Sequence, residues 1–237
     1  MAVLFGVGQK VRPETMSPER TALALLLGAT AALSLIGTVA AYLKFEVMGG
    51  RSTLLTSALI MSYEGNVPTL FSYALLNFCC VLLFLVSARE WDRHSRWCHH
   101  WLALGVLFFL LAFDEAASVH EKLAPILRDY GASGLFHFAW VIPAGIFVAV
   151  MAALYLRWLL ALPGDTAKLM LLSAVLYIGG ALLVEMPEGA YAEVYGQNTF
   201  LFHLLTVVEE TFEMVGLSVF AYALLRHARY LKGDFLG

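Results

Sequence analysis

Long apolar runs alternate with short polar segments along most of this chain. A membrane-spanning helix needs about 20 consecutive, mainly apolar residues, and six segments of the sequence reach that length. We therefore predict an all-α, polytopic membrane protein, a single helical bundle of about six transmembrane helices over residues 1–237. The predicted spans are residues 21–43, 67–88, 101–120, 135–162, 166–186 and 198–226.

The composition supports a membrane protein and argues against other classes. The chain is 60% hydrophobic and only 14% charged, whereas roughly 25% of the residues of a soluble domain are charged. It has no basic patch of the kind that binds nucleic acid, so we expect no nucleic-acid partner. Its three cysteines form neither a disulfide framework nor a CxxC metal motif.

The positions of lysine and arginine predict an orientation in the membrane. These residues concentrate before the first span, after the second and after the sixth, whereas the loop between the fifth and sixth spans contains none. Positively charged loops stay on the cytoplasmic side. We therefore predict that both termini are cytoplasmic, with residues 1–20 and 227–237 as cytoplasmic segments, and that the protein lies in a bacterial inner membrane.

Five acidic residues interrupt two of the predicted spans and are the main clue to function. Asp114 and Glu115 lie in the third span, and Glu209, Glu210 and Glu213 lie in the sixth. An ionised side chain inside the bilayer costs about 2.5–3.5 kcal/mol on insertion scales. Because these segments contain no lysine or arginine before Lys122 and Arg226, protons, other cations or a metal ion must offset this cost.

Helical periodicity is expected to gather the polar residues on single faces. Each residue advances about 100° around a helix, so Asp114, Ser118 and Glu121 share one face of the third span. The sixth span has a polar arc that begins at His203 and ends at Glu213. If the two faces meet inside the bundle, carboxylates and imidazoles converge at one depth, as they do in the metal sites of helical bundles.

Other polar residues lie near the same side of the membrane. Glu185 and Glu188 end the fifth predicted span, and His137 begins the fourth. At the edge of the membrane, their side chains can reach water and need no special role. We therefore interpret them first as ordinary interfacial residues.

Carboxylates that converge with imidazoles suit Fe, Mn or Zn, so we predict a divalent metal cofactor. The Glu-x-x-His motif of di-iron helices is absent at these places, so the spacing does not specify the metal. The predicted metal ligands are Asp114, Glu210, Glu213 and His203. The predicted catalytic residues, which orient these ligands or accept a proton, are Glu115, Glu209 and His120.

Three motifs carry a resemblance to known sequences: GNVPTLFSYALL, FDEAASVHE and EETFEMVGLSVFAYALL. In these motifs the chain resembles bacterial multipass membrane proteins of uncharacterised function that carry DEA-x-S-x-HE and EE-x-x-EM-x-G patterns. The resemblance supports treating the acidic motifs as one set, and it implies no activity.

The sequence leaves three functions open. The first is a metal-dependent intramembrane enzyme that acts on a lipid or another amphiphile. The second is a proton- or cation-coupled transporter or channel whose carboxylates relay the ion. The third is an accessory subunit of a larger bioenergetic or photosynthetic membrane complex. The expected partners are membrane lipid and either a second copy of the chain or a larger membrane complex.

Overall fold

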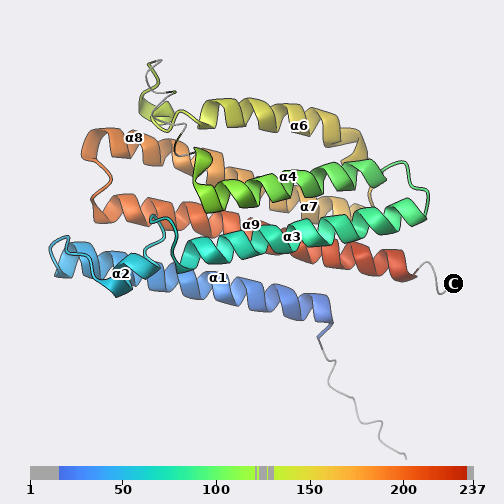
Figure 1. The fold of residues 1–237 in the computed structure, drawn as a ribbon, viewed down its shortest axis with the longest axis horizontal. Coiled ribbons are helices and arrows are strands. Elements are labelled where there is room, and N and C mark those ends of the chain that lie inside the picture. Colours follow the sequence, from blue (N-terminus) through green and yellow to red (C-terminus); the bar gives the residue numbers. More distant parts are fainter. Residues whose placement is uncertain (1–15, 121, 123–126, 128–130, 234–237) are drawn as a thin grey trace, which may run out of the picture.

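The structure is a computed structural model that describes the chain except residues 1–15, 121, 123–126, 128–130 and 234–237. The described part forms helices and contains no strand, and the long helices lie side by side along one axis (Figure 1). Five of them are long and apolar enough to cross a membrane. The all-α prediction is therefore confirmed, and the helices are of the kind that a multipass membrane protein uses.

The helices follow the predicted spans with shifted ends. In chain order they are α1 (Pro18–Tyr42), the π turn η1 (Leu43–Val47), α2 (Leu54–Leu59), α3 (Val67–Asp92), α4 (Cys98–Ala117), the 3-10 turn η2 (Gly134–Phe136), α6 (Val141–Ala161), α7 (Gly164–Ile178), the π turn η3 (Gly179–Val184), α8 (Glu185–Tyr195) and α9 (Phe200–Gly233).

Two of the predicted spans differ most from the observed helices. The fifth was expected to end at residue 186, but α7 continues through η3 into α8 and ends only at Tyr195. The sixth corresponds to α9, which has 34 residues and is long enough to cross a bilayer. Because three glutamates interrupt its apolar run, α9 is not one of the five helices that also meet the requirement for apolar content.

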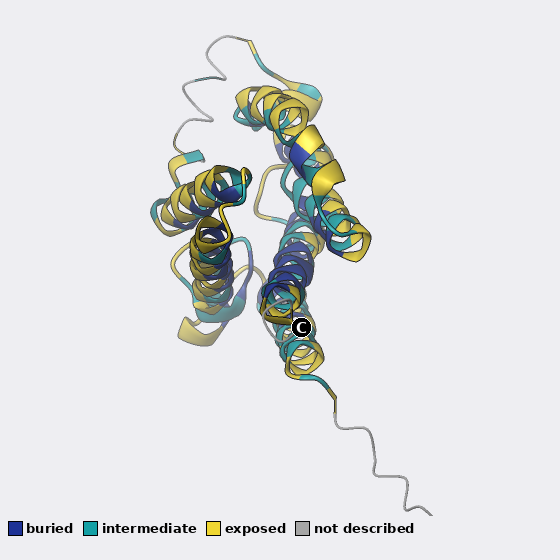
Figure 2. Ribbon diagram, turned by 90° about the vertical axis from the view of Figure 1, so that its right-hand side faces the viewer, coloured by how far each residue is buried: buried dark blue, intermediate teal, exposed yellow. Residues whose placement is uncertain are grey.

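Helix α9 is the central helix of the bundle. Helices α1, α3 and α7 all pack against it, and its residues Met214, Leu217 and Leu224 are almost completely buried. Figure 2 looks along the helices and shows exposed residues on their outer faces and buried residues between them. The outer faces are therefore suited to lipid, and the acidic residues of α9 belong to a helix at the centre of the protein.

Two glycines allow α7 and η3 to lie directly on α9. A Cβ atom at Gly180 would come within 2.8 Å of the backbone oxygen of Glu209, and one at Gly216 would come within 2.7 Å of the backbone nitrogen of Tyr177. Small residues at such contacts let membrane helices approach closely. The contact at Gly180 places the π turn η3 beside the acidic part of α9.

The end of α4 corrects the predicted polar face of the third span. The helix was expected to continue to residue 120, but it ends at Ala117, and Ser118 adopts a left-handed conformation with φ 48° and ψ 47°. A left-handed residue turns the chain away from the helix axis. Asp114 and Ser118 therefore do not share one face of a continuous helix, and Glu121 lies outside the described residues.

Candidate functional site

A cavity of about 1060 Å³ lies among α4, α6, the α7–α8 segment and α9. It is unusually acidic for the interior of a membrane bundle. Its described lining contains two histidines, His120 and His137, and no lysine or arginine. The acidic residues of the lining are Glu64, Asp114, Glu115, Glu185, Glu188, Glu209, Glu210 and Glu213.

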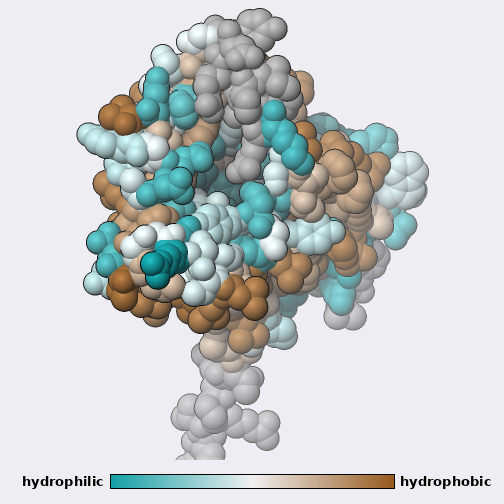
Figure 3. All heavy atoms as spheres, turned by 60° about the vertical axis from the view of Figure 1, so that its left-hand side comes forward, coloured by the Kyte–Doolittle hydropathy of each residue, from teal (hydrophilic) through white to brown (hydrophobic). Residues whose placement is uncertain are grey.

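The remainder of the cavity is apolar, and the two kinds of lining lie toward opposite ends. Along α4 the lining runs from Leu104 to the acidic Asp114 and Glu115. Along α9 it runs from Phe220 back to the three glutamates and ends at Thr206 and Phe202. Phe147 of α6 adds to the apolar part. Hydrophilic side chains border a hollow at the acidic end (Figure 3). The cavity thus has the polarity of an amphiphile, with an acidic end and an apolar extension.

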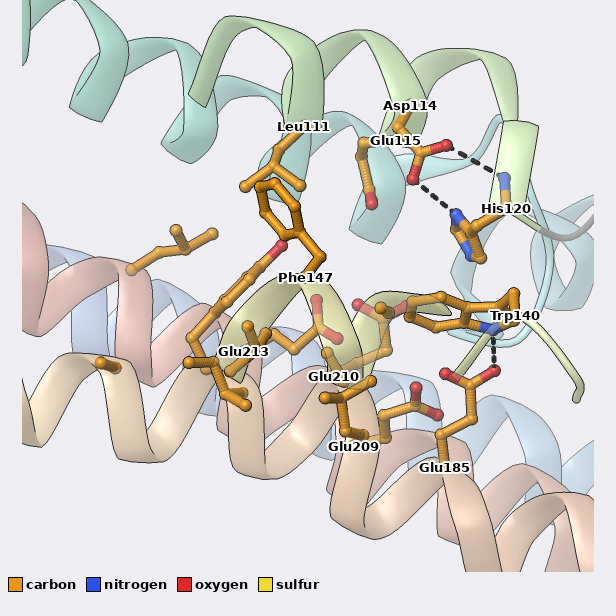
Figure 4. Close-up of a pocket in the computed structure, with 18 of the residues that line it drawn as sticks. Leu111, Asp114, Glu115, His120, Trp140, Phe147, Glu185, Glu209, Glu210 and Glu213 are labelled. Carbon is orange, nitrogen blue, oxygen red and sulfur yellow. Dashed lines mark hydrogen bonds and ion pairs between the residues drawn. The ribbon is translucent and has the colours of Figure 1, made fainter. Parts of the chain in front are cut away.

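Asp114 and His120 are joined by two hydrogen bonds at the acidic end of the cavity. The backbone N–H of His120 donates to Asp114 Oδ1 over 3.0 Å, and His120 Nδ1 lies 2.7 Å from Asp114 Oδ2. The left-handed turn at Ser118 brings the two residues together. Both carboxylate oxygens of Asp114 are therefore engaged by His120, so Asp114 orients the imidazole ring (Figure 4).

Trp140 connects this pair to the opposite wall of the cavity. Its ring centroid lies 4.9 Å from that of His120, and its Nε1–H donates to Glu185 Oε1 over 2.6 Å. Figure 4 shows this connection from the end of α4 to the start of α8. The three side chains fix the position of His120 at the acidic end.

Glu185 and Glu188 are buried, with exposed fractions of 8% and 3%. Glu188 Oε1 accepts a hydrogen bond from Thr206 Oγ1 over 2.7 Å, and Glu209 interacts electrostatically with both glutamates. Their interpretation as ordinary interfacial residues is therefore wrong. The fifth span continues beyond the expected membrane edge as α8, and this continuation places both side chains inside the bundle.

Glu115, Glu210 and Glu213 point into the cavity from α4 and α9 (Figure 4). They are close enough for electrostatic interactions between Glu115 and Glu210 and between Glu115 and Glu213. However, nowhere in the described part of the chain do three or more His, Cys, Asp or Glu side chains form a group that could hold a metal ion. The carboxyl groups therefore surround the cavity without converging on one point.

His203, the fourth predicted metal ligand, lies outside the lining of this cavity. Its Nδ1 is hydrogen bonded to the hydroxyl of Ser62, and its ring stacks on that of Phe45 with centroids 4.6 Å apart. The buried Lys44 of η1 donates to Tyr63, whose ring also contacts His203. Because Ser62 does line the cavity, it separates His203 from the carboxylates, and the role of His203 as a metal ligand stays a prediction.

Comparison with known proteins gives a family and no activity. The family model described as a domain of unknown function, DUF8692, matches residues 18–228. Neither a curated protein nor a solved structure matches the chain. The matched range contains every residue that lines the cavity, so the cavity is a feature of the family domain in this chain.

Proposed function

Because the chain belongs to this family of unknown function, we propose its activity from the cavity alone: it binds a cationic amphiphile and exchanges it for protons. The ligand class is a molecule with one or more amino groups attached to an apolar chain or ring system. The observation that supports this function is one cavity whose described lining has eight acidic side chains and no lysine or arginine, and which adjoins an apolar extension. The protein thereby belongs among cation-coupled transporters.

The spacing of the acids favours an organic cation over a single metal ion. A metal ion needs several ligand atoms about 2.0–2.6 Å from one point, whereas the described carboxyl groups stand around the cavity. An ammonium group has hydrogen bond donors that reach several carboxylates from within a wide cavity. The apolar extension beside Phe108 and Phe147 accommodates the chain of the amphiphile.

Protons replace the amphiphile when the cavity is empty. Several ionised carboxylates in one membrane cavity repel one another and are poorly solvated. Protons relieve this repulsion in the empty state, and the ammonium group relieves it in the bound state. Binding of the cation therefore releases protons, and a gradient of one species can move the other.

A binding experiment with three ligands of equal chain length tests the proposal. Decylamine, decanol and decanoate are titrated by calorimetry into the full-length protein in amphipol, with empty amphipol as the blank. Charge-assisted hydrogen bonds contribute about 1.5–3 kcal/mol, so decylamine is expected to bind at least about tenfold more tightly than decanol. Decanoate is expected not to bind, because its charge is repelled by the acidic end.

Two variants locate the binding site. Glu210→Gln, in the cavity lining, is expected to weaken decylamine binding about tenfold. Glu46→Gln is the control, since Glu46 is exposed on η1 and lies outside the lining. Equal binding of decanol and decylamine, or an unchanged affinity in the Glu210 variant, would contradict the proposal.

A metal-dependent enzyme acting on a lipid-like substrate is the second candidate function. The Asp114–His120 pair favours it, because a carboxylate that orients an imidazole is a frequent arrangement for a general base. Glu115, Glu210 and Glu213 point into the same cavity, and their carboxylates would have to move together to hold Fe, Mn or Zn. A metal ion bound there would activate a water molecule, and the apolar extension would hold the lipid chain.

Elemental analysis distinguishes the two candidates. Protein purified without chelator is expected to contain no stoichiometric Fe, Mn or Zn if the amphiphile is the ligand. Stoichiometric metal in the wild type that is lost in Glu213→Gln would replace the first proposal with the second, because removal of one carboxylate deletes a ligand while the amide keeps a similar volume.

A further inference from the structure

A second cavity lies at the opposite end of the bundle and shares no lining residue with the acidic one. It has a volume of about 520 Å³ and lies among the α3–α4 loop, the α6–α7 loop and the last turns of α9. Its polar and aromatic lining residues include Glu90, Arg93, Trp97, Trp101, His227 and Tyr230.

A buried imidazole–carboxylate pair forms one wall of this cavity. His227 Nε2 lies 3.3 Å from Glu90 Oε1, and the exposed fractions of the two residues are 2% and 9%. The His227 ring stacks on Trp101 with centroids 4.9 Å apart. Among the described residues, neither His227 Nδ1 nor Trp101 Nε1 has a hydrogen bond partner.

The polar groups of this cavity are mainly hydrogen bond donors. The indole N–H of Trp101 can only donate, and a guanidinium such as that of Arg93 carries five N–H donors. Glu90 Oε1 lies against His227, and Arg93 Nη1 donates to the backbone oxygen of Leu231 over 3.3 Å. The indole N–H of Trp101 and the guanidinium of Arg93 therefore supply the donors, and Arg93 supplies the positive charge, that a ligand in this cavity meets. A tetrahedral oxyanion such as a phosphoryl group is complementary to this arrangement.

The surroundings of the cavity indicate where the phosphoryl group comes from. Arg89 lies near Arg93 on the last turn of α3, and Arg229 and Lys232 lie on the last turns of α9. Basic residues beside transmembrane helices attract anionic lipids. Trp97 and Tyr230 are residue types that anchor proteins at the level of lipid headgroups.

We propose that this second cavity binds the phosphoryl headgroup of an anionic phospholipid, with Arg93 and Trp101 as its donors. The site is independent of the acidic cavity, so either can fail without the other. It would hold the basic end of the bundle against the leaflet that contains the lipid.

Native mass spectrometry of the full-length protein tests this site. Phosphatidylglycerol and diacylglycerol with the same acyl chains are supplied as competing lipids, and retained adducts are counted. Because hydrogen bonds to a charged group contribute about 1.5–3 kcal/mol, the phospholipid is expected to be retained at least about tenfold more than diacylglycerol. Inorganic phosphate is added in a separate arm as a competitor.

The variants use two neighbouring arginines. Arg93→Gln is expected to lower phospholipid retention about tenfold, and the folding of the variant is checked by its thermal unfolding. Arg96→Gln is the matched control, since Arg96 stacks on Trp97 with its guanidinium 4.6 Å from the ring centroid and does not line the cavity. Its retention should equal that of the wild type.

Four outcomes would overturn the assignment. Equal retention of the two lipids would show that the protein does not recognise the phosphoryl group. Unchanged retention in Arg93→Gln, or an equal loss in both arginine variants, would show that the lipid does not bind in this cavity. Full displacement of the lipid by millimolar inorganic phosphate, with phosphate itself bound in a manner that depends on Arg93, would make a soluble phosphate compound the ligand and overturn its lipid source.

Discussion

At the scale of single residues, Asp114 holds the imidazole ring of His120 in position. Both of its carboxylate oxygens are engaged by His120, one by the backbone N–H and one by Nδ1. The sequence identified both residues as members of a site but assigned Asp114 to a metal. The sequence could not show the pairing, because the pairing depends on the left-handed conformation of Ser118. Serine seldom adopts this conformation, so its presence in a sequence does not predict such a turn.

A double-mutant cycle on this pair is the prediction at the residue scale. Asp114→Asn, His120→Gln and the double variant are compared by their free energies of unfolding in detergent. The side chains are 31% and 28% exposed, so we expect a coupling energy of about 1 kcal/mol. Asp165→Asn is the control: its contact with Arg226 is largely exposed and should change stability by less than about 0.5 kcal/mol. Additive effects of Asp114→Asn and His120→Gln would show that the pair does not act as a unit.

At the scale of elements, the π turn η3 determines how the acidic cavity is built. Its Gly180 lies against Glu209 and Glu213 of α9, and the turn leads directly into α8, which carries Glu185 and Glu188. π turns inside helices frequently mark functional sites. The sequence predicted the apolar helix that leads into this turn, since its length is visible in the apolar run. It did not predict that the helix continues to Tyr195, because the apolar run that defined the span ends near residue 186.

The two adjacent glycines of η3 provide a prediction with an internal control. A methyl group at Gly180 would lie 2.8 Å from a backbone oxygen of α9, whereas one at Gly179 would meet nothing within 4 Å. We expect Gly180→Ala to destabilise the protein by about 1–3 kcal/mol and to weaken decylamine binding, because η3 must move away from the glutamates. Gly179→Ala should do neither. Thermal unfolding and calorimetry of the two variants measure this, and equal behaviour would mean that the close contact is unimportant.

At the scale of the whole molecule, the apolar runs were sufficient to predict an all-helical bundle with helices apolar enough to span a membrane. The acids of α4 and α9 line one cavity, and its role as the functional site stays a prediction. The arrangement of the carboxyl groups around that site was not predictable. Helical periodicity gives the face on which Glu210 and Glu213 lie, but the width of the space between α4 and α9 depends on the packing of α6 and α7, for which the sequence has no simple signal.

The orientation of the whole bundle remains a prediction from the distribution of lysine and arginine. We expect reporter fusions at residues 1 and 237 to be active in the cytoplasm and a fusion at Glu193 to be active outside, since the loop that follows α8 has no positive charge. Reversed reporter activities would place the acidic cavity on the cytoplasmic side. The lipid proposed for the second cavity would then come from the outer leaflet.

Proton release on binding is the prediction that joins the acidic cavity to transport. An ammonium group favours ionised carboxylates beside it, so carboxyl groups that hold protons in the empty cavity must lose them when decylamine binds. By linkage, a ligand that binds with release of protons binds more tightly as the pH rises. We therefore expect the affinity for decylamine to increase between about pH 5 and pH 8, where the amine itself stays charged because its pKa is close to that of lysine.

Calorimetry in two buffers with different ionisation enthalpies counts the protons released for each decylamine bound. Glu210→Gln removes one carboxyl group that can exchange a proton for the cation, so this variant should release fewer protons as well as bind more weakly. Glu46→Gln should release the wild-type number, because Glu46 lies outside the cavity. If the wild type bound decylamine without releasing protons, the protein would be a receptor for the amphiphile. It would lack the coupling to protons on which transport against a gradient depends.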